Sequence, residues 1–243
     1  MTTFSPITST TPSTFVSGTL EESLRVKELE EELDQLRQST ISGFNQLLEL
    51  KDLSTGVHSC RLAEWAVVLA GRLGLDRQTQ QDVKTAALLH DLGKIGIPDA
   101  ILHKPGALAP EERVIINKHP EYGWSALRMI PGFERVSLFV RHHHERVDGK
   151  GYPAGLKGEE IPLGSRIVCV MDAFDAMVSN RCYRKGLPIE EALRRLKTCG
   201  GSQFDPQVVK HFLRIIRPNM SQGLSIRRPL SVGQPMRIAG NYR

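Results

Sequence analysis

The chain has 243 residues, 40% of them hydrophobic, and carries a formal net charge of +5. This length suits one domain with appendages, and the hydrophobic content is sufficient for a packed core. No apolar run approaches the roughly 20 residues that a membrane-spanning helix needs, and the first twenty residues lack the basic-then-apolar order of a secretory signal. We therefore expect a cytoplasmic protein without a membrane span. The four cysteines are scattered and form no Cys-x-x-Cys pair, which favours reduced thiols over disulfides. They are Cys60, Cys169, Cys182 and Cys199.

The N-terminal region divides into two segments of different composition. Residues 1–19 are rich in Ser, Thr and Pro and contain no charged residue, which predicts a disordered segment. Residues 20–50 are rich in Glu, Leu, Lys and Arg, and apolar residues recur at heptad spacing at Val26, Leu29, Leu33 and Leu36. We predict a short coiled-coil or linker helix whose seam continues through Ile41, Phe44 and Leu48. The helix either forms a homodimer with a second copy, which we favour, or packs on its own domain.

His90 and Asp91 lie at the end of a strongly apolar helix predicted over residues 76–92. A carboxylate in such a place is costly unless a cation meets it, and a metal ion is an economical partner. Lys94 comes three residues after Asp91 and shares its face if the helical turn persists, so its ammonium group can meet an anionic substrate. A His and an Asp that only cap the helix remain the alternative for this segment alone.

Three adjacent histidines, His142 to His144, precede a loop that contains two glycines and a proline. Adjacent imidazoles are costly to bury, because each ring has a donor and an acceptor to satisfy, whereas a metal ion satisfies the acceptor nitrogen. Downstream, Asp172 lies in the middle of the most apolar predicted helix of the chain. Its carboxylate needs a cation or a hydrogen-bond network, and the histidines are suitable co-ligands for a cation.

Four motifs occur in a fixed order along the chain. They are His-Asp-x-Gly-Lys-Ile-Gly-Ile-Pro from His90, His-x-x-x-Gly from His119, His-His-Glu-Arg-x-Asp-Gly-x-Gly-Tyr-Pro from His143 and Asp-x-Phe-Asp-Ala-Met from Asp172. Together they resemble the HD-GYP family, which belongs to the HD-domain metal-dependent phosphohydrolases. The match extends over about residues 51–212. It implies an all-α fold with an HD-type helical bundle over residues 51–217, after the coiled-coil helix and before a basic disordered tail at 218–243.

The resemblance also implies a metal site. Its ligands would be seven side chains: His58, His90, Asp91, His119, His143, His144 and Asp172. Two divalent ions, iron or manganese, are the expected cofactors. Family members with a third metal have a glutamate four residues before the position of His58, where this chain has Ser54, so a third metal is doubtful. His142 comes one residue before the His-His pair of the family motif, so it is interpreted as a neighbour of the ligands.

The implied reaction is hydrolysis of the bacterial second messenger cyclic di-GMP to linear pGpG, with cleavage on to GMP left open. Two cations bridged by Asp91 would lower the pKa of a shared water, so that hydroxide attacks the phosphodiester in line. Lys94 would stabilise charge in the transition state, and Asp175 would orient a ligand or take a proton.

Three further side chains are expected to bind the substrate. Residues 180–185 resemble the family segment that meets the nucleotide, and a guanidinium group donates two hydrogen bonds at once, so Arg181 and Arg184 are predicted phosphate clamps. Tyr152 is predicted to contact a guanine or to donate its hydroxyl group. The alternatives are a structural salt bridge for Arg181 and a loop-packing role for Tyr152.

Two other functions stay open from the sequence. One is a non-catalytic cyclic di-GMP receptor or partner-docking module, which the complete ligand set disfavours. The other is hydrolysis of another cyclic nucleotide, such as cyclic GMP-AMP. The helical seam is also compatible with docking on a separate sensor protein. The basic tail is interpreted as solvated, and no specific nucleic-acid binding is expected.

Overall fold

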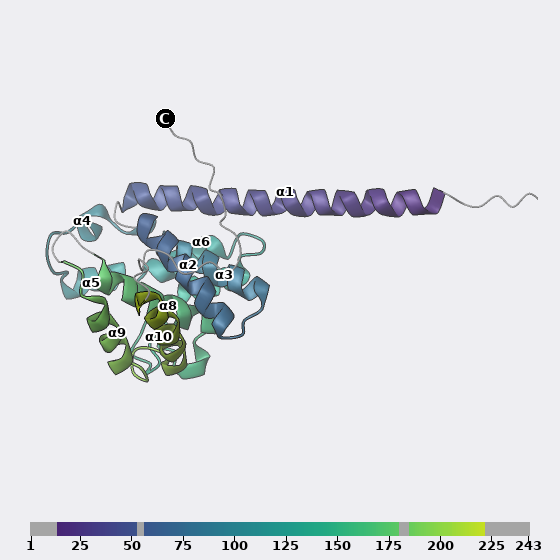
Figure 1. Ribbon diagram of the computed structural model, residues 1–243. Coiled ribbons are helices and arrows are strands. Elements are labelled where there is room, and N and C mark those ends of the chain that lie inside the picture. Colours follow the sequence, from purple (N-terminus) through teal and green to yellow (C-terminus); the bar gives the residue numbers. More distant parts are fainter. Residues whose placement is uncertain (1–13, 53–55, 180–184, 222–243) are drawn as a thin grey trace, which may run out of the picture. The chain divides into compact units, whose positions relative to one another are not determined.

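The computed structural model describes residues 14–52, 56–179 and 185–221, with the backbone alone for 14–19, 56–58 and 217–221. Its regular elements are all helical, and the described residues contain isolated β-bridges but no strand (Figure 1). The predicted all-α fold is therefore confirmed. In chain order the elements are α1 (Thr14–Lys51), α2 (Gly56–Arg72), α3 (Arg77–Leu89), η1 (Leu92–Gly96), α4 (Asp99–Leu102), α5 (Pro110–Ile116), α6 (His119–Leu127), α7 (Glu134–Arg141), η2 (Gly158–Glu160), α8 (Leu163–Val178), α9 (Ile189–Thr198) and α10 (Pro206–Ser221).

The chain divides into two compact units, residues 1–42 and residues 43–243, and α1 crosses the boundary between them. In the described part of the first unit the helix starts at Thr14, inside the segment that the sequence predicts to be disordered. Helices in the described ranges lack the combination of length and apolar composition that is needed to span a bilayer.

The predicted course of the α1 seam is wrong beyond Leu36. The predicted continuation includes Ile41 and Leu48, which are both buried, whereas Leu47 and Leu50 are exposed. Five residues separate Leu36 from Ile41, and this step rotates the side chain by about 140° away from the seam. The exposed apolar residues instead keep the heptad spacing of the first part of the helix, and they resume at Leu47 and Leu50.

The core of the second unit lies between α2, α3, α7 and α8, and α10 packs against α2, α8 and α9. An aromatic cluster joins three of these helices. The ring of Phe212 in α10 meets Trp65 of α2 edge-on at 6.0 Å and Phe174 of α8 at 4.9 Å between centroids. Burying each large side chain contributes about 1.5–3 kcal/mol, so this cluster holds α10 on the bundle.

Close backbone packing positions η1 against α6. Gly93 lies so near the start of α6 that a Cβ atom there would be 1.8 Å from the carbonyl oxygen of His119 and 2.5 Å from the backbone nitrogen of Gly123. Only glycine permits this approach. It brings the end of α3, which carries His90 and Asp91, next to the first turn of α6.

Candidate metal centre

Three of the predicted ligands are held at helix junctions in the same way. His90 follows α3, His119 begins α6 after a two-residue junction with α5, and His143 follows α7. In each ring Nδ1 lies at hydrogen-bond distance from a backbone carbonyl three residues earlier. A carbonyl oxygen only accepts, so Nδ1 carries the proton and Nε2 keeps its lone pair. The acceptors are Ala87 O at 2.9 Å, Ile116 O at 2.7 Å and Val140 O at 2.6 Å.

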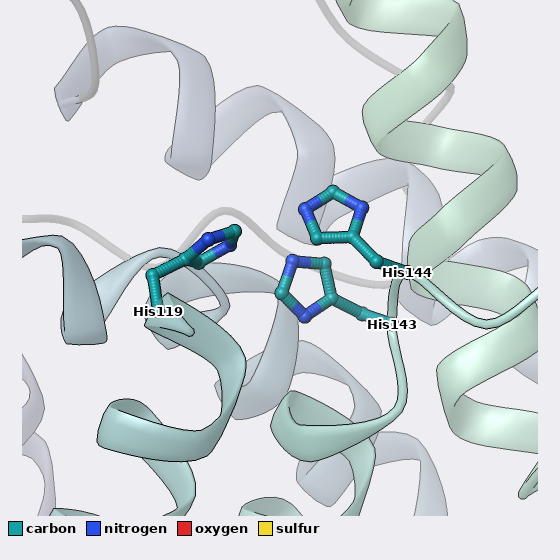
Figure 2. A group of neighbouring side chains, drawn as sticks. All are labelled: His119, His143 and His144. Carbon is teal, nitrogen blue, oxygen red and sulfur yellow. The ribbon is translucent and has the colours of Figure 1, made fainter. Parts of the chain in front are cut away.

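His144 completes a group of imidazoles around one point. Ligand atoms of His119, His143 and His144 all lie within 4.8 Å of one another, and Figure 2 shows the three rings turned toward a shared space. Nε2 of His119 and Nε2 of His143 are buried and have no hydrogen-bond partner in the described structure. Buried acceptors of this kind need a partner, and a metal ion bound at the lone pairs would supply one.

Two carboxylates add oxygen donors to these nitrogens. Asp91 lies between two rings, with Oδ2 at 3.3 Å from His90 Nε2 and Oδ1 at 3.4 Å from His119 Nε2. Asp172 in α8 lies across the site, with Oδ1 at 3.8 Å from His90 Nε2. Imidazole nitrogens mixed with carboxylate oxygens suit divalent transition metals such as iron and manganese. The residues therefore fit the ions that the sequence implies.

The protonation states also suit a cation. Burial lowers the pKa of His143 well below its usual value and lowers the pKa of His144 to about 3, so both rings are neutral at neutral pH. Burial alone would raise the pKa of Asp91, but Lys94 and His90 hold it well below the usual range. Neutral imidazole and ionised carboxylate are the forms that bind metals.

Lys94 lies in η1 and contacts two carboxylates. Its Nζ donates to Asp91 Oδ2 at 2.8 Å and lies 3.5 Å from Asp52 Oδ2. Burial would lower the pKa of Lys94, but Asp91 and Asp52 raise it above the usual value, so the side chain stays cationic. The sequence reasoning missed Asp52, and the signal for it was weak: an acid directly after the last residue of a helix, six residues before His58.

The loop after the histidines is built around Glu145, which is buried. Its Oε1 accepts from the backbone nitrogens of Ala154 and Gly155 at 2.7 and 3.1 Å, and its Oε2 accepts from Leu156 N at 3.1 Å. A carboxylate that accepts three backbone hydrogen bonds fixes the course of the loop. This carboxylate also lies 3.6 Å from Nδ1 of His142, so His142 faces the loop.

Tyr152 stands beside the histidine group. Its ring lies 4.9 Å from that of His144 between centroids, at an interplanar angle of 34°. Its placement depends on Gly151, because a Cβ there would be 2.4 Å from Arg146 N and 2.6 Å from His144 O. Burial raises the pKa of Tyr152, and nearby Asp172 raises it further, so the hydroxyl group stays protonated and can donate.

Four predicted site residues are not placed in this group. His58 belongs to α2, but its side chain lies outside the described residues, as do Arg181 and Arg184 entirely. Asp175 is described, and its carboxylate accepts from Arg61 of α2 and from Ser179 Oγ at 2.8 Å. These contacts favour a role in joining α2 to α8, and an acid–base role for Asp175 stays a prediction.

An all-helical bundle whose helix ends bring a His-Asp pair together with further histidines and a distant aspartate defines the HD type of protein. The model of the family described as HD domain matches residues 43–208, which is more than half of the chain. The chain therefore belongs to the HD domain family, and the relatives that it matches confirm the predicted HD-GYP resemblance.

Relatives and a solved structure give the same result. A "Cyclic di-GMP phosphodiesterase" of Thermotoga maritima is 42% identical over 71% of this chain and 47% of that protein. A "3'3'-cGAMP-specific phosphodiesterase 3" of Vibrio cholerae is 34% identical over 72% of this chain and 38% of that protein. The structure of Bd1817, an HDG"Y"P protein from Bdellovibrio bacteriovorus, superposes with a TM-score of 0.54 at 24% identity, covering 68% of this chain and 54% of that chain. The chain spans less than half the length of either relative.

Proposed function

We propose that this chain is a metal-dependent phosphodiesterase that hydrolyses cyclic di-GMP to linear pGpG. The observation that carries the proposal is the convergence of His119, His143 and His144 beside Asp91, with two buried Nε2 atoms that lack a partner in the described structure. The name of the Thermotoga maritima relative supports the substrate.

Two divalent ions, iron or manganese, are the proposed cofactors. His90, Asp91, His119, His143, His144 and Asp172 would hold them together with His58. The ions would supply an activated water and would neutralise charge on the phosphodiester. Ser54 replaces the glutamate expected for a third ion, so two ions are proposed.

The other side chains of the site act on the substrate. Lys94 is cationic and partly exposed, so it can donate to a phosphate oxygen as charge develops there. Tyr152 lies beside His144 and offers a hydroxyl donor and an aromatic face to the nucleotide. Arg181 and Arg184 are proposed phosphate clamps.

A turnover assay with chromatography of the products tests this function. Wild-type protein loaded anaerobically with iron or manganese is expected to convert cyclic di-GMP to pGpG, and Arg181→Gln should raise KM for the dinucleotide by roughly tenfold. Tight binding of cyclic di-GMP by metal-loaded protein without turnover would instead establish a receptor.

Hydrolysis of 3'3'-cGAMP is a second candidate, because a relative named for that activity matches 72% of this chain. The same assay with both dinucleotides at equal concentration separates the candidates. A higher kcat/KM for cyclic di-GMP supports the main proposal, and a higher kcat/KM for 3'3'-cGAMP would replace it.

We also propose that α1 forms a parallel, two-stranded coiled coil with a second copy of this chain. Exposed apolar side chains occupy the a and d positions of a heptad, and β-branched Val26 at a with Leu29 at d favours two strands. The seam comprises Val26, Leu29, Leu33, Leu36, Leu47 and Leu50.

The charges beside the seam support the parallel arrangement. In this register Arg25 and Glu32 occupy g positions, and Glu30 and Arg37 occupy the following e positions. In a parallel pair, g of one helix faces the next e of the other. Arg25 would then face Glu30 of the second copy, and Glu32 would face Arg37, so both pairs are attractive.

A further inference from the structure

Asp52 is a carboxylate at the edge of the metal centre with no role in the function proposed above. It follows Lys51, the last residue of α1, and its side chain is partly buried. Its Oδ2 lies 3.5 Å from Nζ of Lys94, which in turn donates to Asp91 Oδ2 at 2.8 Å. The ammonium group of Lys94 is therefore shared between a predicted metal ligand and a carboxylate that comes from α1.

The end of α1 is anchored so that Asp52 stays in this place. The side chain of Lys51 donates to Asp99 Oδ1 in α4 at 2.5 Å. The carbonyl of Lys51 accepts from Nε2 of His103, directly after α4, at 3.0 Å. The backbone nitrogen of Asp52 donates to Leu48 O at 2.8 Å, and Leu48 is only 1% exposed.

These contacts hold the end of α1 directly before the Asp52 side chain. One anchor uses a side chain, a second uses a backbone carbonyl, and the third is the last turn of the helix. The first two join α1 to α4 and the residue after it, and α4 follows the η1 segment that carries Lys94. The relative position of the Asp52 carboxylate and the Lys94 ammonium is thus set by packing and does not depend on the salt bridge alone.

We propose that Asp52 is a positioning residue that holds Lys94 for the substrate phosphate, so that the end of α1 forms part of the site. An ammonium group has three N–H donors. One points to Asp91 and one to Asp52, which leaves the third for a phosphate oxygen. Without Asp52, the ammonium group turns toward Asp91 alone and no longer faces the phosphate.

This inference rests on the proposed function and adds a residue and a helix to it. Because Lys94 acts on charge that develops in the transition state, the loss of its positioning lowers kcat more than it raises KM. Because Asp52 does not itself belong to the histidine group, its removal leaves the metal content unchanged.

The test compares Asp52→Asn, Asp52→Glu and wild type, all loaded with the same metal. For Asp52→Asn we expect kcat for cyclic di-GMP to fall by at least about tenfold, KM to change by less than about threefold, and metal per chain to equal that of wild type. Asp52→Glu keeps the carboxylate and should recover most of kcat. Asp82→Asn is the matched control, because Asp82 is a buried aspartate paired with Arg135 two turns before His90; its kcat should match wild type.

A second pair of variants tests the anchor. His103→Ala removes a contact to α1 and leaves Asp52 in place, so kcat should fall by a smaller factor than in Asp52→Asn. The double variant should be no slower than Asp52→Asn alone, because both changes act through the same carboxylate.

The outcomes separate this inference from the function on which it rests. A wild-type protein that does not turn over cyclic di-GMP contradicts the proposed function. Turnover by wild type with a kcat within about twofold in Asp52→Asn, or an equal loss in Asp52→Asn and Asp52→Glu, overturns the role of Asp52 alone.

Discussion

The metal centre depends on how individual side chains are held. His90, His119 and His143 each donate from Nδ1 to a carbonyl three residues earlier, so Nε2 is aimed inward before any ligand binds. The sequence identified these histidines by their neighbours along the chain. It could not identify Asp52 or explain Glu145, because their partners are distant in sequence or are backbone groups. Those roles follow from tertiary contacts and have no local pattern.

A substitution at Gly93 tests whether the close packing of η1 against α6 positions the predicted metal ligands. A Cβ at Gly93 would overlap the carbonyl of His119, so Gly93→Ala must push η1 away from α6. We expect a loss of about 1–3 kcal/mol in the free energy of unfolding, typical of overpacking, together with fewer metal ions per chain. Urea unfolding and metal analysis provide the two measurements.

Gly43→Ala is the matched control for that substitution. Gly43 lies inside α1, and a Cβ there meets no atom within 4 Å in the described structure. Alanine should stabilise the helix by up to about 1 kcal/mol. Equal stability changes in the two variants would contradict the packing account of Gly93.

The ion pair between Arg146 and Asp148 makes stability depend on pH. Arg146 donates to both carboxylate oxygens, at 3.0 and 2.6 Å, and lowers the pKa of Asp148 to about 2. Because the folded-state pKa lies below the usual value of about 3.9, the pair stabilises the fold above that pH and is lost as the pH falls toward 2. The stability difference between wild type and Arg146→Gln, measured by urea unfolding, should be smaller at pH 3 than at pH 5. A difference that does not change with pH would contradict this pairing.

At the scale of elements, the sequence predicted where helices form better than it predicted which of their faces pack against other helices. The heptad spacing from Val26 to Leu36 predicted the α1 helix, but apolar residues on two faces of its second half left the direction of the seam ambiguous. Burial resolved it, since Leu48 is buried while Leu47 and Leu50 are exposed. The helix that ends before His90 and the helix that contains Asp172 followed from apolar periodicity.

The coiled-coil proposal makes a clear prediction for this helix. Leu29→Glu together with Leu33→Glu places carboxylates at adjacent d and a positions of the seam, where they would be buried and repel each other in a dimer. Light scattering should show a dimer for wild type and a monomer for the variant. A control with Glu28→Gln and Glu31→Gln, outside the a and d positions, should remain dimeric; an unchanged mass in the leucine variant would mean that α1 does not pair through this seam.

At the scale of the whole molecule, the spaced motifs predicted the all-α HD bundle through their resemblance to the HD-GYP family, which implies that their ligands converge. That convergence is seen for His90, Asp91, His119, His143 and His144, which lie at helix ends, and for Asp172, which lies inside α8. The sequence could not predict how α1 enters the site, because the contacts of Lys51 and Asp52 depend on where η1 and α4 lie. If both proposals hold, the helix that pairs two copies also supplies a side chain to the site.

Turnover of cyclic di-GMP, measured beside metal content, tests the central claim most directly. Asp91 lies between His90 and His119, so Asp91→Ala removes the carboxylate that joins the two rings. Wild-type protein loaded anaerobically with iron or manganese should produce pGpG, lose this activity on chelation and regain it when metal is restored, while Asp91→Ala should fall by at least about a hundredfold. Wild-type protein with two bound metals and no more turnover than Asp91→Ala would contradict the assignment as a phosphodiesterase.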